Sequence, residues 1–269
     1  MIDKGKKNLL GIYIDAVDYE AVVTKIIRAA QEQRSLAVSA LAVHGVMTGI
    51  LDPIHAARLN TLDLVVPDGQ PVRWALNLLH GTNLPGRVYG PTLMLKVCAQ
   101  AAMEGLPIYL YGSTSDVLLR LADNLRNQFP RLQIAGLQPS RFRQITLTEK
   151  EEIIQTIATS GARILFVGLG CPRQEVWVYE HRGLLPMPML AVGAAFAFHA
   201  GVVAQAPPQL QKMGLEWFYR LVREPKRLWR RYLKLNPLYL WLVGLQLMGL
   251  RRFHPTEITP PDQNTLRYG

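Results

Sequence analysis

The amino-acid sequence predicts an α/β protein with a mostly parallel sheet and helices on both faces. Short apolar runs bounded by turn residues alternate with longer amphipathic stretches, a pattern typical of parallel strands joined by helical crossovers. The strand candidates are apolar almost throughout, as expected for strands covered on both faces. With 269 residues, 49% of them hydrophobic, the chain can bury a large core.

The predicted strands are apolar runs that end at turns: Ala37–Val43, Leu62–Val66, Pro107–Tyr111, Leu132–Gly136, Arg163–Val167 and Met189–Val192. The predicted helices lie between or beside them: Tyr19–Gln33, Gln70–Leu79, Thr92–Glu104, Ser115–Gln128, Thr148–Thr159 and Arg173–His181. Thr148 stands three residues before Glu151, the spacing of a capping box, so we expect it to begin its helix. This order of elements indicates a Rossmann-like sheet.

The last part of the chain differs from the rest in charge. Residues 209–252 carry ten Lys or Arg against two Glu, whereas residues 1–208 are nearly neutral and the whole chain has a net charge of +10. We therefore divide the chain into an α/β body (1–208), a basic helical appendage (209–252) and a tail (253–269) that we expect to be disordered. A basic segment suits an anionic partner: nucleic acid, an acidic membrane surface or a phosphorylated small molecule.

Within the appendage, helices are predicted over Gln209–Val222 and Pro225–Leu235, and Asn236-Pro237 separates them from the apolar run Leu238–Leu250. That run is too short to span a bilayer, and its basic flanks suggest that it lies in a membrane interface or packs on protein.

Three arginines of the appendage, Arg220, Arg223 and Arg227, fall on one face if a single helix runs through them. On one interpretation, these arginines form a basic face that contacts solvent and nothing else. Aromatic residues between the basic ones instead favour a segment that packs with one face and meets an anion with the other.

Several classes of function lack their motifs in this sequence. Two cysteines, Cys98 and Cys171, are too few for a disulfide scaffold or a structural zinc site, which favours a reducing compartment. There is no P-loop pattern, no complete dinucleotide fingerprint after Gly168 and no Asp-x-Asp pair. The histidines show no metal-ligand spacing. We expect neither a metal site nor a cofactor.

The candidate ligand site is the set of loops after the strands, because open α/β sheets bind ligands outside the carboxyl ends of their strands. Glycines follow three of the predicted strands, at Gly112, at Gly168 and Gly170, and at Gly193. Glycine lets the backbone approach a ligand closely, and the next helix offers free N–H groups to a phosphate. Three such loops favour a phosphorylated or nucleotide ligand.

Asp68 is the carboxylate best placed for catalysis. It stands in a Pro-Asp-Gly turn directly after the strand Leu62–Val66, where a general base could reach a hydroxyl of a bound ligand. Taken alone, Pro-Asp-Gly favours ordinary turn chemistry, with Asp bonding the backbone. The catalytic interpretation therefore depends on what surrounds this turn.

Five segments occur in one order along the chain: Pro67-Asp68-Gly69, Arg87-Val-Tyr-Gly90, Val167–Glu175, Val192–Gly201 and Gly214–Arg231. Together they resemble the WecG/TagA/CpsF family of glycosyltransferases (glycosyltransferase family 26). The similarity extends from about Leu9 to Leu235, and the last segment is long enough to be specific.

The resemblance implies a metal-independent, inverting transferase. Such an enzyme moves an N-acetylmannosamine-type sugar from UDP to a polyprenyl-diphosphate-linked sugar during synthesis of cell-surface polysaccharide or teichoic acid. It implies a base at Asp68 and diphosphate-stabilising charges at Arg220, Arg223 and Arg227. We expect the donor to be bound by Gly69, Gln70, Gly90, Tyr111, Gly112, Gly168, Gly170, Gln174, Glu175 and Gly193.

The resemblance also implies an appendage that closes over the site and contacts the membrane. The expected location is therefore cytoplasmic, at the inner face of the cell membrane, and a homo-oligomer is left open.

Two departures from the family pattern keep alternatives open. The chain has Ala40-Leu41-Ala42, followed by His44, where members often carry Thr-x-Asn, and Ala195-Phe196-Ala197 where they carry Gly-x-Phe-Asp. One alternative is a catalytically inactive protein of the same fold that binds a UDP-sugar or a polyprenyl phosphate. Another is a nucleic-acid-binding module, which the apolar run Leu238–Leu250 fits poorly.

Overall fold

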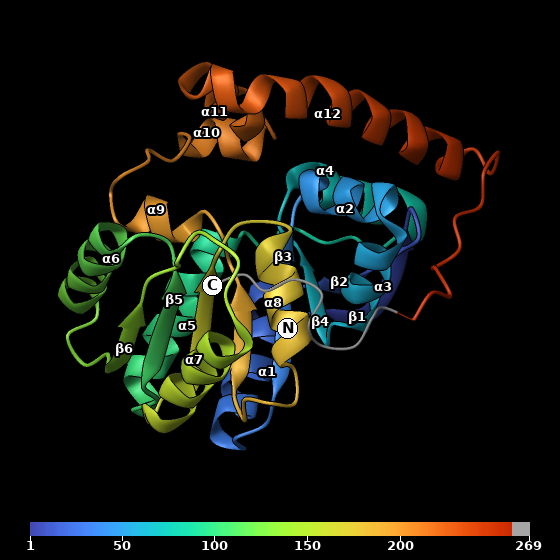
Figure 1. Ribbon diagram of the computed structural model, residues 1–269. Helices are drawn as coiled ribbons and strands as arrows, with labels where there is room; N and C mark the ends of the chain where they lie inside the picture. The colour runs from blue at the N-terminus through green and yellow to red at the C-terminus, as the bar shows by residue number, and fades with distance from the viewer. Residues whose placement is uncertain (260–269) are drawn as a thin grey trace.

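The structure is a computed structural model that describes residues 1–259, with the side chains of Arg227 and Arg231 outside the described part. Within these residues, six parallel strands form a central sheet in the order β4-β3-β8-β7-β5-β6 (Figure 1). They are β3 (Leu36–Leu41), β4 (Leu64–Pro67), β5 (Ile108–Gly112), β6 (Ile134–Gln138), β7 (Ile164–Gly168) and β8 (Pro188–Ala191). Each predicted strand agrees with one of these to within two residues, and the α/β class is confirmed.

Successive residues of each strand enter two different cores, one on each face of the sheet. Val38, Leu110 and Phe166 belong to the core of one face, whereas their neighbours Ala37, Tyr111 and Val167 belong to the other. The first core is covered by α1 (Tyr19–Gln31), α5 (Gly90–Glu104), α6 (Ser115–Gln128) and α9 (Ala195–His199). The second is covered by α2 (Val43–Leu51), α3 (Pro53–Thr61), α4 (Gln70–His80), α7 (Leu147–Thr159) and α8 (Arg173–His181).

An N-terminal hairpin, β1 (Asp3–Leu9) and β2 (Ile12–Val17), pairs antiparallel beside the sheet and was not among the predicted elements. Most of β1 is polar and exposed, so it lacks the apolar run that marks a buried strand. The buried Asp15 of β2 accepts a hydrogen bond of 2.7 Å from the backbone N–H of Val65 in β4. This bond attaches the hairpin to the edge of the sheet.

The predicted capping box of α7 is wrong by two residues. Thr146, not Thr148, caps the helix: its hydroxyl accepts from the N–H of Glu149, whose side chain accepts from the N–H of Thr146. Both pairs have the required spacing, so the sequence alone did not decide between them.

The appendage begins with two short helices rather than one. The predicted helix Gln209–Val222 is divided into α10 (Pro208–Lys212) and α11 (Glu216–Arg223) around Gly214, whose φ is +72°. A side chain at Gly214 would also collide with the ring of Trp74 in α4, with a Cβ 2.6 Å from it. Close packing of the appendage against α4 therefore needs glycine here.

A single helix, α12 (Pro225–Leu247), then runs through Asn236 and Pro237, so the predicted interruption is wrong. Its later half packs on the body: Tyr239 is buried, and its hydroxyl donates to the carbonyl of Pro71 over 3.1 Å. This burial offsets the local cost of proline inside a helix. Figure 1 shows α12 lying across the molecule above α2 and α4. Among the described residues, no helix has both the length and the apolar content needed to cross a bilayer.

Beyond α12, the backbone carbonyl of Phe253 accepts a hydrogen bond from Asn8 of the hairpin. Residues 260–269, the larger part of the predicted disordered tail, lie outside the described residues.

Candidate active site

Asp68 lies at the carboxyl edge of the sheet, directly after β4. Leu41 and Pro67 are register partners at the ends of β3 and β4, and the N–H of Asp68 donates to the carbonyl of Leu41. One Asp68 oxygen accepts a hydrogen bond of 2.9 Å from the N–H of Gly90, the first residue of α5. The carboxyl group is thus fixed at a helix N-terminus, where a negative charge is favoured.

Burial raises the pKa of the Asp68 carboxyl to about 6, from its ordinary value of 3.8. The positive charge of Arg87 opposes this rise, whereas the negative charge of Glu216 reinforces it. A carboxylate with a pKa near 6 is ionised at neutral pH and is a stronger base than an ordinary aspartate.

Arg87 and Tyr89 connect the body to the appendage beside Asp68. Arg87 donates from Nη2 to Glu216 of α11 over 2.6 Å and to Gln211 of α10 over 3.1 Å. The Tyr89 hydroxyl donates to the other Glu216 oxygen over 2.9 Å, and the Arg87 guanidinium lies 4.0 Å from the centre of the Tyr89 ring. Burial and the charge of Glu216 raise the pKa of Tyr89, so its hydroxyl stays a donor at neutral pH.

The three predicted arginines of the appendage are not arranged as expected. The half-buried Arg220 acts electrostatically on Asp68, and its guanidinium lies 5.6 Å from the centre of the Phe198 ring. Arg223 is exposed and lies over Tyr219, 5.4 Å from its ring centre. The helix breaks at Glu224, so Arg227 belongs to α12 and the single helical face is wrong; its side chain lies outside the described part.

The glycines that end β5 and β7 lie side by side. Gly112 and Gly168 are register partners, and a Cβ on Gly112, whose φ is +110°, would lie 2.7 Å from the carbonyl carbon of Gly168. No residue other than glycine fits at position 112 unless the backbone of Gly168 moves. The structure thus brings two of the predicted donor-binding loops together.

The side chains of Gln174 and Glu175 are buried behind the loop after β7. Gln174 accepts from the N–H of Gly170 over 3.1 Å and donates to Glu175 over 2.8 Å. Ser39 of β3 also donates to Glu175, and Gly193 lies against Gln174. These groups therefore fix the loop from within and connect it to β3 and to the turn after β8.

Tyr111 is also fully buried, and its ring packs 5.0 Å from that of Trp177 on the face of the sheet covered by α8. A ligand at the sheet edge would meet the backbone at this position.

Gly69 and Gln70 begin α4, next to Asp68. Gln70 has a buried Oε1 without a hydrogen-bond partner in the described part of the chain. Ala40 and Ala42, where family members often carry polar residues, lie close to Gly90 and Gly69 respectively. The first of the two departures from the family pattern therefore lies next to Asp68. His44 is half-buried at the start of α2.

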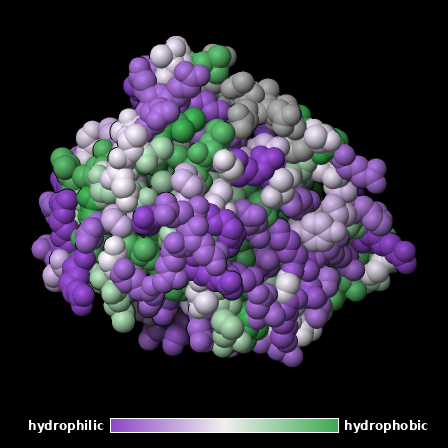
Figure 2. Space-filling view, turned by 90° about the horizontal axis from the view of Figure 1, so that it is seen from below, coloured by the Kyte–Doolittle hydropathy of each residue, from purple (hydrophilic) through white to green (hydrophobic). Residues whose placement is uncertain are grey.

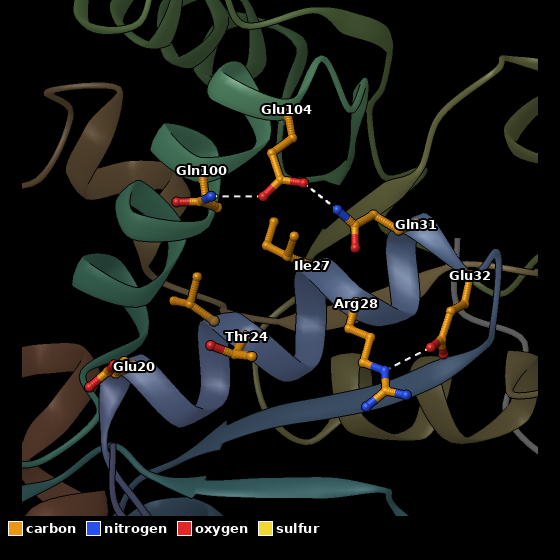
Figure 3. A pocket seen from close by; sticks show the side chains of 9 residues that line it. Glu20, Thr24, Ile27, Arg28, Gln31, Glu32, Gln100 and Glu104 are labelled. Atoms are coloured by element: carbon orange, nitrogen blue, oxygen red, sulfur yellow. Dashed lines mark hydrogen bonds and ion pairs between the residues drawn. The ribbon is translucent and has the colours of Figure 1, made fainter.

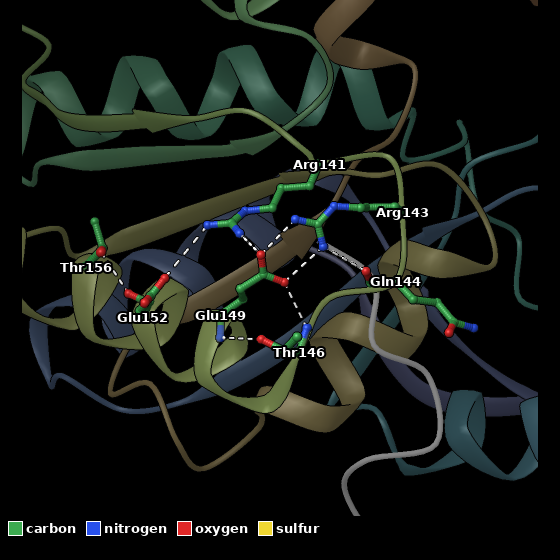
Figure 4. A network of polar contacts seen from close by, with 7 residues as sticks. All are labelled: Arg141, Arg143, Gln144, Thr146, Glu149, Glu152 and Thr156. Carbon is green, nitrogen blue, oxygen red and sulfur yellow. Dashed lines mark hydrogen bonds and ion pairs between the residues drawn. The ribbon is translucent and has the colours of Figure 1, made fainter.

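Two other polar features lie on different elements. An open hollow between α1 and α5, lined among others by Glu20, Arg28 and Glu104, contains none of the predicted site residues (Figure 3). Glu149 at the start of α7 binds Arg141 and Arg143 of the preceding loop (Figure 4). That network fixes the loop after β6. Within residues 1–259, no three His, Cys, Asp or Glu side chains are grouped as metal ligands.

Residues 7–253 match the Glycosyl transferase WecG/TagA/CpsF family. The chain belongs to this family. It is a glycosyltransferase, as the resemblance implied.

Two curated relatives are both named N-acetylglucosaminyldiphosphoundecaprenol N-acetyl-beta-D-mannosaminyltransferase. The protein of Bacillus spizizenii is 30% identical over 71% of this chain and 72% of its own length. That of Bacillus subtilis is 29% identical over 73% of this chain and 74% of its own length.

In this member of the WecG/TagA/CpsF family, sequence reasoning missed the part played by Arg87, Tyr89 and Glu216. Arg87 and Tyr89 belong to a segment that carries the family resemblance, and that was the available signal. Glu216 also lies in such a segment, Gly214–Arg231, but nothing there indicates its partners, which are more than a hundred residues away.

Proposed function

We propose that this glycosyltransferase moves an N-acetylmannosamine-type sugar from a UDP-sugar to a polyprenyl-diphosphate-linked sugar, with inversion and without a metal. The observation that carries the proposal is the half-buried Asp68, whose pKa is raised to about 6 beside arginines at the edge of the sheet. The names of the two relatives support the donor and acceptor classes. The polysaccharide or teichoic acid that receives the sugar would belong to the cell envelope.

In the proposed reaction, ionised Asp68 takes the proton of an acceptor hydroxyl. The hydroxyl oxygen forms a bond to the anomeric carbon from the side opposite the leaving group, and the bond from that carbon to the diphosphate oxygen breaks. One displacement of this kind inverts the anomeric centre. UDP leaves with the electron pair, and the Asp68 proton passes to solvent.

The charge that develops on the departing diphosphate needs fixed positive partners. Arg220 is better placed than Arg223, because it is half-buried and acts on Asp68. The backbone at Gly112, Gly168 and Gly193 would hold the donor, and the buried Gln174 and Glu175 would act by shaping the loop. Arg223, which is exposed, fits a membrane contact better than a diphosphate contact.

Membrane association through the appendage is supported by its exposed apolar residues. Leu240, Trp241, Leu247, Met248 and Leu250 are each at least half exposed, and basic residues stand on both sides of them, as in helices that lie in a membrane interface. By contrast, hydrophilic residues predominate on the face opposite the appendage (Figure 2). We propose a peripheral position at the inner face of the cell membrane.

The proposal is tested with purified protein, UDP-N-acetylmannosamine and a polyprenyl-diphosphate-linked N-acetylglucosamine acceptor in detergent. We expect transfer that persists in EDTA and yields an inverted linkage, and Asp68→Asn should bind UDP but lose turnover. UDP binding without transfer by the wild type would instead identify an inactive binding protein, the alternative that Ala40 and Ala42 keep open. Near-normal turnover by Asp68→Asn would exclude this carboxylate as the base.

A further inference from the structure

Glu216 of α11 joins the appendage to the residues beside Asp68. Its carboxylate is bound by Arg87 through one oxygen and by Tyr89 through the other. The Arg87 and Glu216 side chains are only 11% and 13% exposed. A pair that is so largely removed from water is screened little by solvent, so its charges act strongly on their neighbours.

We propose that Glu216 is a positioning residue, which holds the Arg87 guanidinium away from Asp68 and so keeps Asp68 an effective base while the appendage is docked. This inference rests on the proposed role of Asp68.

Two carboxylates compete for Arg87. Burial lowers the pKa of Arg87, but the charges of Asp68 and Glu216 raise it. The hydrogen bonds go to the appendage: both acceptors of Nη2 are there, on Glu216 and Gln211. If Glu216 lost its charge, Asp68 would remain as the carboxylate partner of the guanidinium, and a closer Arg87 would weaken Asp68 as a base.

The other groups that act on Asp68 do not replace Glu216. Asp68 accepts from the N–H of Gly90, and the neighbouring charged or titratable side chains come from α1, from the loop before α5 and from α11: Tyr19, Arg87, Tyr89, Glu216 and Arg220. Burial raises the pKa of both tyrosines, so they are neutral near pH 7. Burial is the main cause of the raised pKa of Asp68, and within this set Glu216 is the negative charge that adds to it.

The test compares three variants of the full chain. Glu216→Gln removes the charge but can still accept from Arg87 and Tyr89. Glu216→Asp keeps the charge, and Tyr89→Phe removes one hydrogen bond to Glu216 without changing any charge. Glu32→Gln is the matched control, because Glu32 pairs with Arg28 at the surface, after α1 and at the opposite edge of the sheet.

Two readouts are needed: the pH dependence of kcat/KM, and a ¹³C NMR titration of Asp68 in carboxyl-labelled protein, assigned with Asp68→Asn. We expect Glu216→Gln to lower the apparent pKa in both by about 1 unit, the size of effect that one nearby charge produces. Tyr89→Phe, Glu216→Asp and Glu32→Gln should leave it unchanged, although the first two can reduce kcat.

An unchanged Asp68 titration in Glu216→Gln would overturn the inference, as would an equal shift in Tyr89→Phe, because loss of docking alone would then explain both. The NMR titration does not depend on turnover. If the wild type transfers no sugar, the proposed function fails while the electrostatic role of Glu216 is still measured.

Discussion

Replacing Asp68 with Asn should stabilise the folded protein at neutral pH while removing sugar transfer. The folded-state pKa of Asp68 is raised from 3.8 to about 6. At about 1.4 kcal/mol per pKa unit, ionising this carboxyl in the folded protein costs about 3 kcal/mol more than in the unfolded chain. Asn keeps an oxygen that can accept from Gly90 and removes the charge.

The sign of the pH dependence follows from the raised pKa. The stability that protonated Asp68 contributes is fully present below about pH 4 and is lost as the pH rises through about 6. The Asn variant has no such loss. Its advantage over the wild type should be near zero at pH 4 and should reach up to about 3 kcal/mol at pH 8, or about 6–12 °C in Tm.

Urea unfolding of both proteins at several pH values between 4 and 8 measures this difference. Asp116→Asn is the control: Asp116 forms an exposed ion pair with Arg120, and such pairs contribute little. An Asn variant that is no more stable than the wild type at pH 8 would show that Asp68 is not desolvated. The explanation of its strength as a base would then be wrong.

Three further predictions concern the appendage and the glycine loops. Arg220→Ala should reduce kcat about 10²–10³-fold, the usual cost of losing a fixed transition-state partner, whereas the exposed Arg223→Ala should reduce it far less in detergent assays. Gly112→Ala should lower Tm more than Gly161→Ala, because both have positive φ but only Gly112 also faces backbone within 3 Å; equal losses would contradict this. Replacing Leu240 and Trp241 with Ser should reduce sedimentation with anionic vesicles without lowering Tm, since both side chains are more than 60% exposed; unchanged sedimentation would argue against membrane contact through α12.

The sheet could be predicted because its strands are buried on both faces. Such strands appear as short apolar runs, and each predicted run matched a strand to within two residues. The β1–β2 hairpin could not be found in this way, since the Lys-rich β1 faces solvent. The continuity of α12 through Pro237 also escaped prediction, because contacts with distant parts of the chain, such as the bond from Tyr239 to Pro71, stabilise the helix there.

Topology predicts where the candidate site lies, but it does not predict the charge network found there. Asp68 and the glycines follow strands of one parallel sheet, so they must meet at its carboxyl edge. Nothing local, however, indicates that Glu216 reaches Arg87 and Tyr89. The sequence also does not indicate that the polar side chains of Gln174 and Glu175 point inward and fix the loop after β7.

The orientation of α11 links the catalytic and membrane proposals. Glu216 and Arg220, one turn apart, act on Asp68, whereas Phe218 and Val222, also one turn apart, are 51% and 64% exposed. An ordinary surface helix buries its apolar face and exposes its polar one; α11 departs from this in part, because Phe218 and Val222 face outward while Glu216 and Arg220 face the body. Exposed apolar surface of this kind is costly in water and favourable at a bilayer. α11 therefore has the orientation expected of a helix that lies between a polar site and a membrane, where it would bring a lipid-linked acceptor within reach of Asp68.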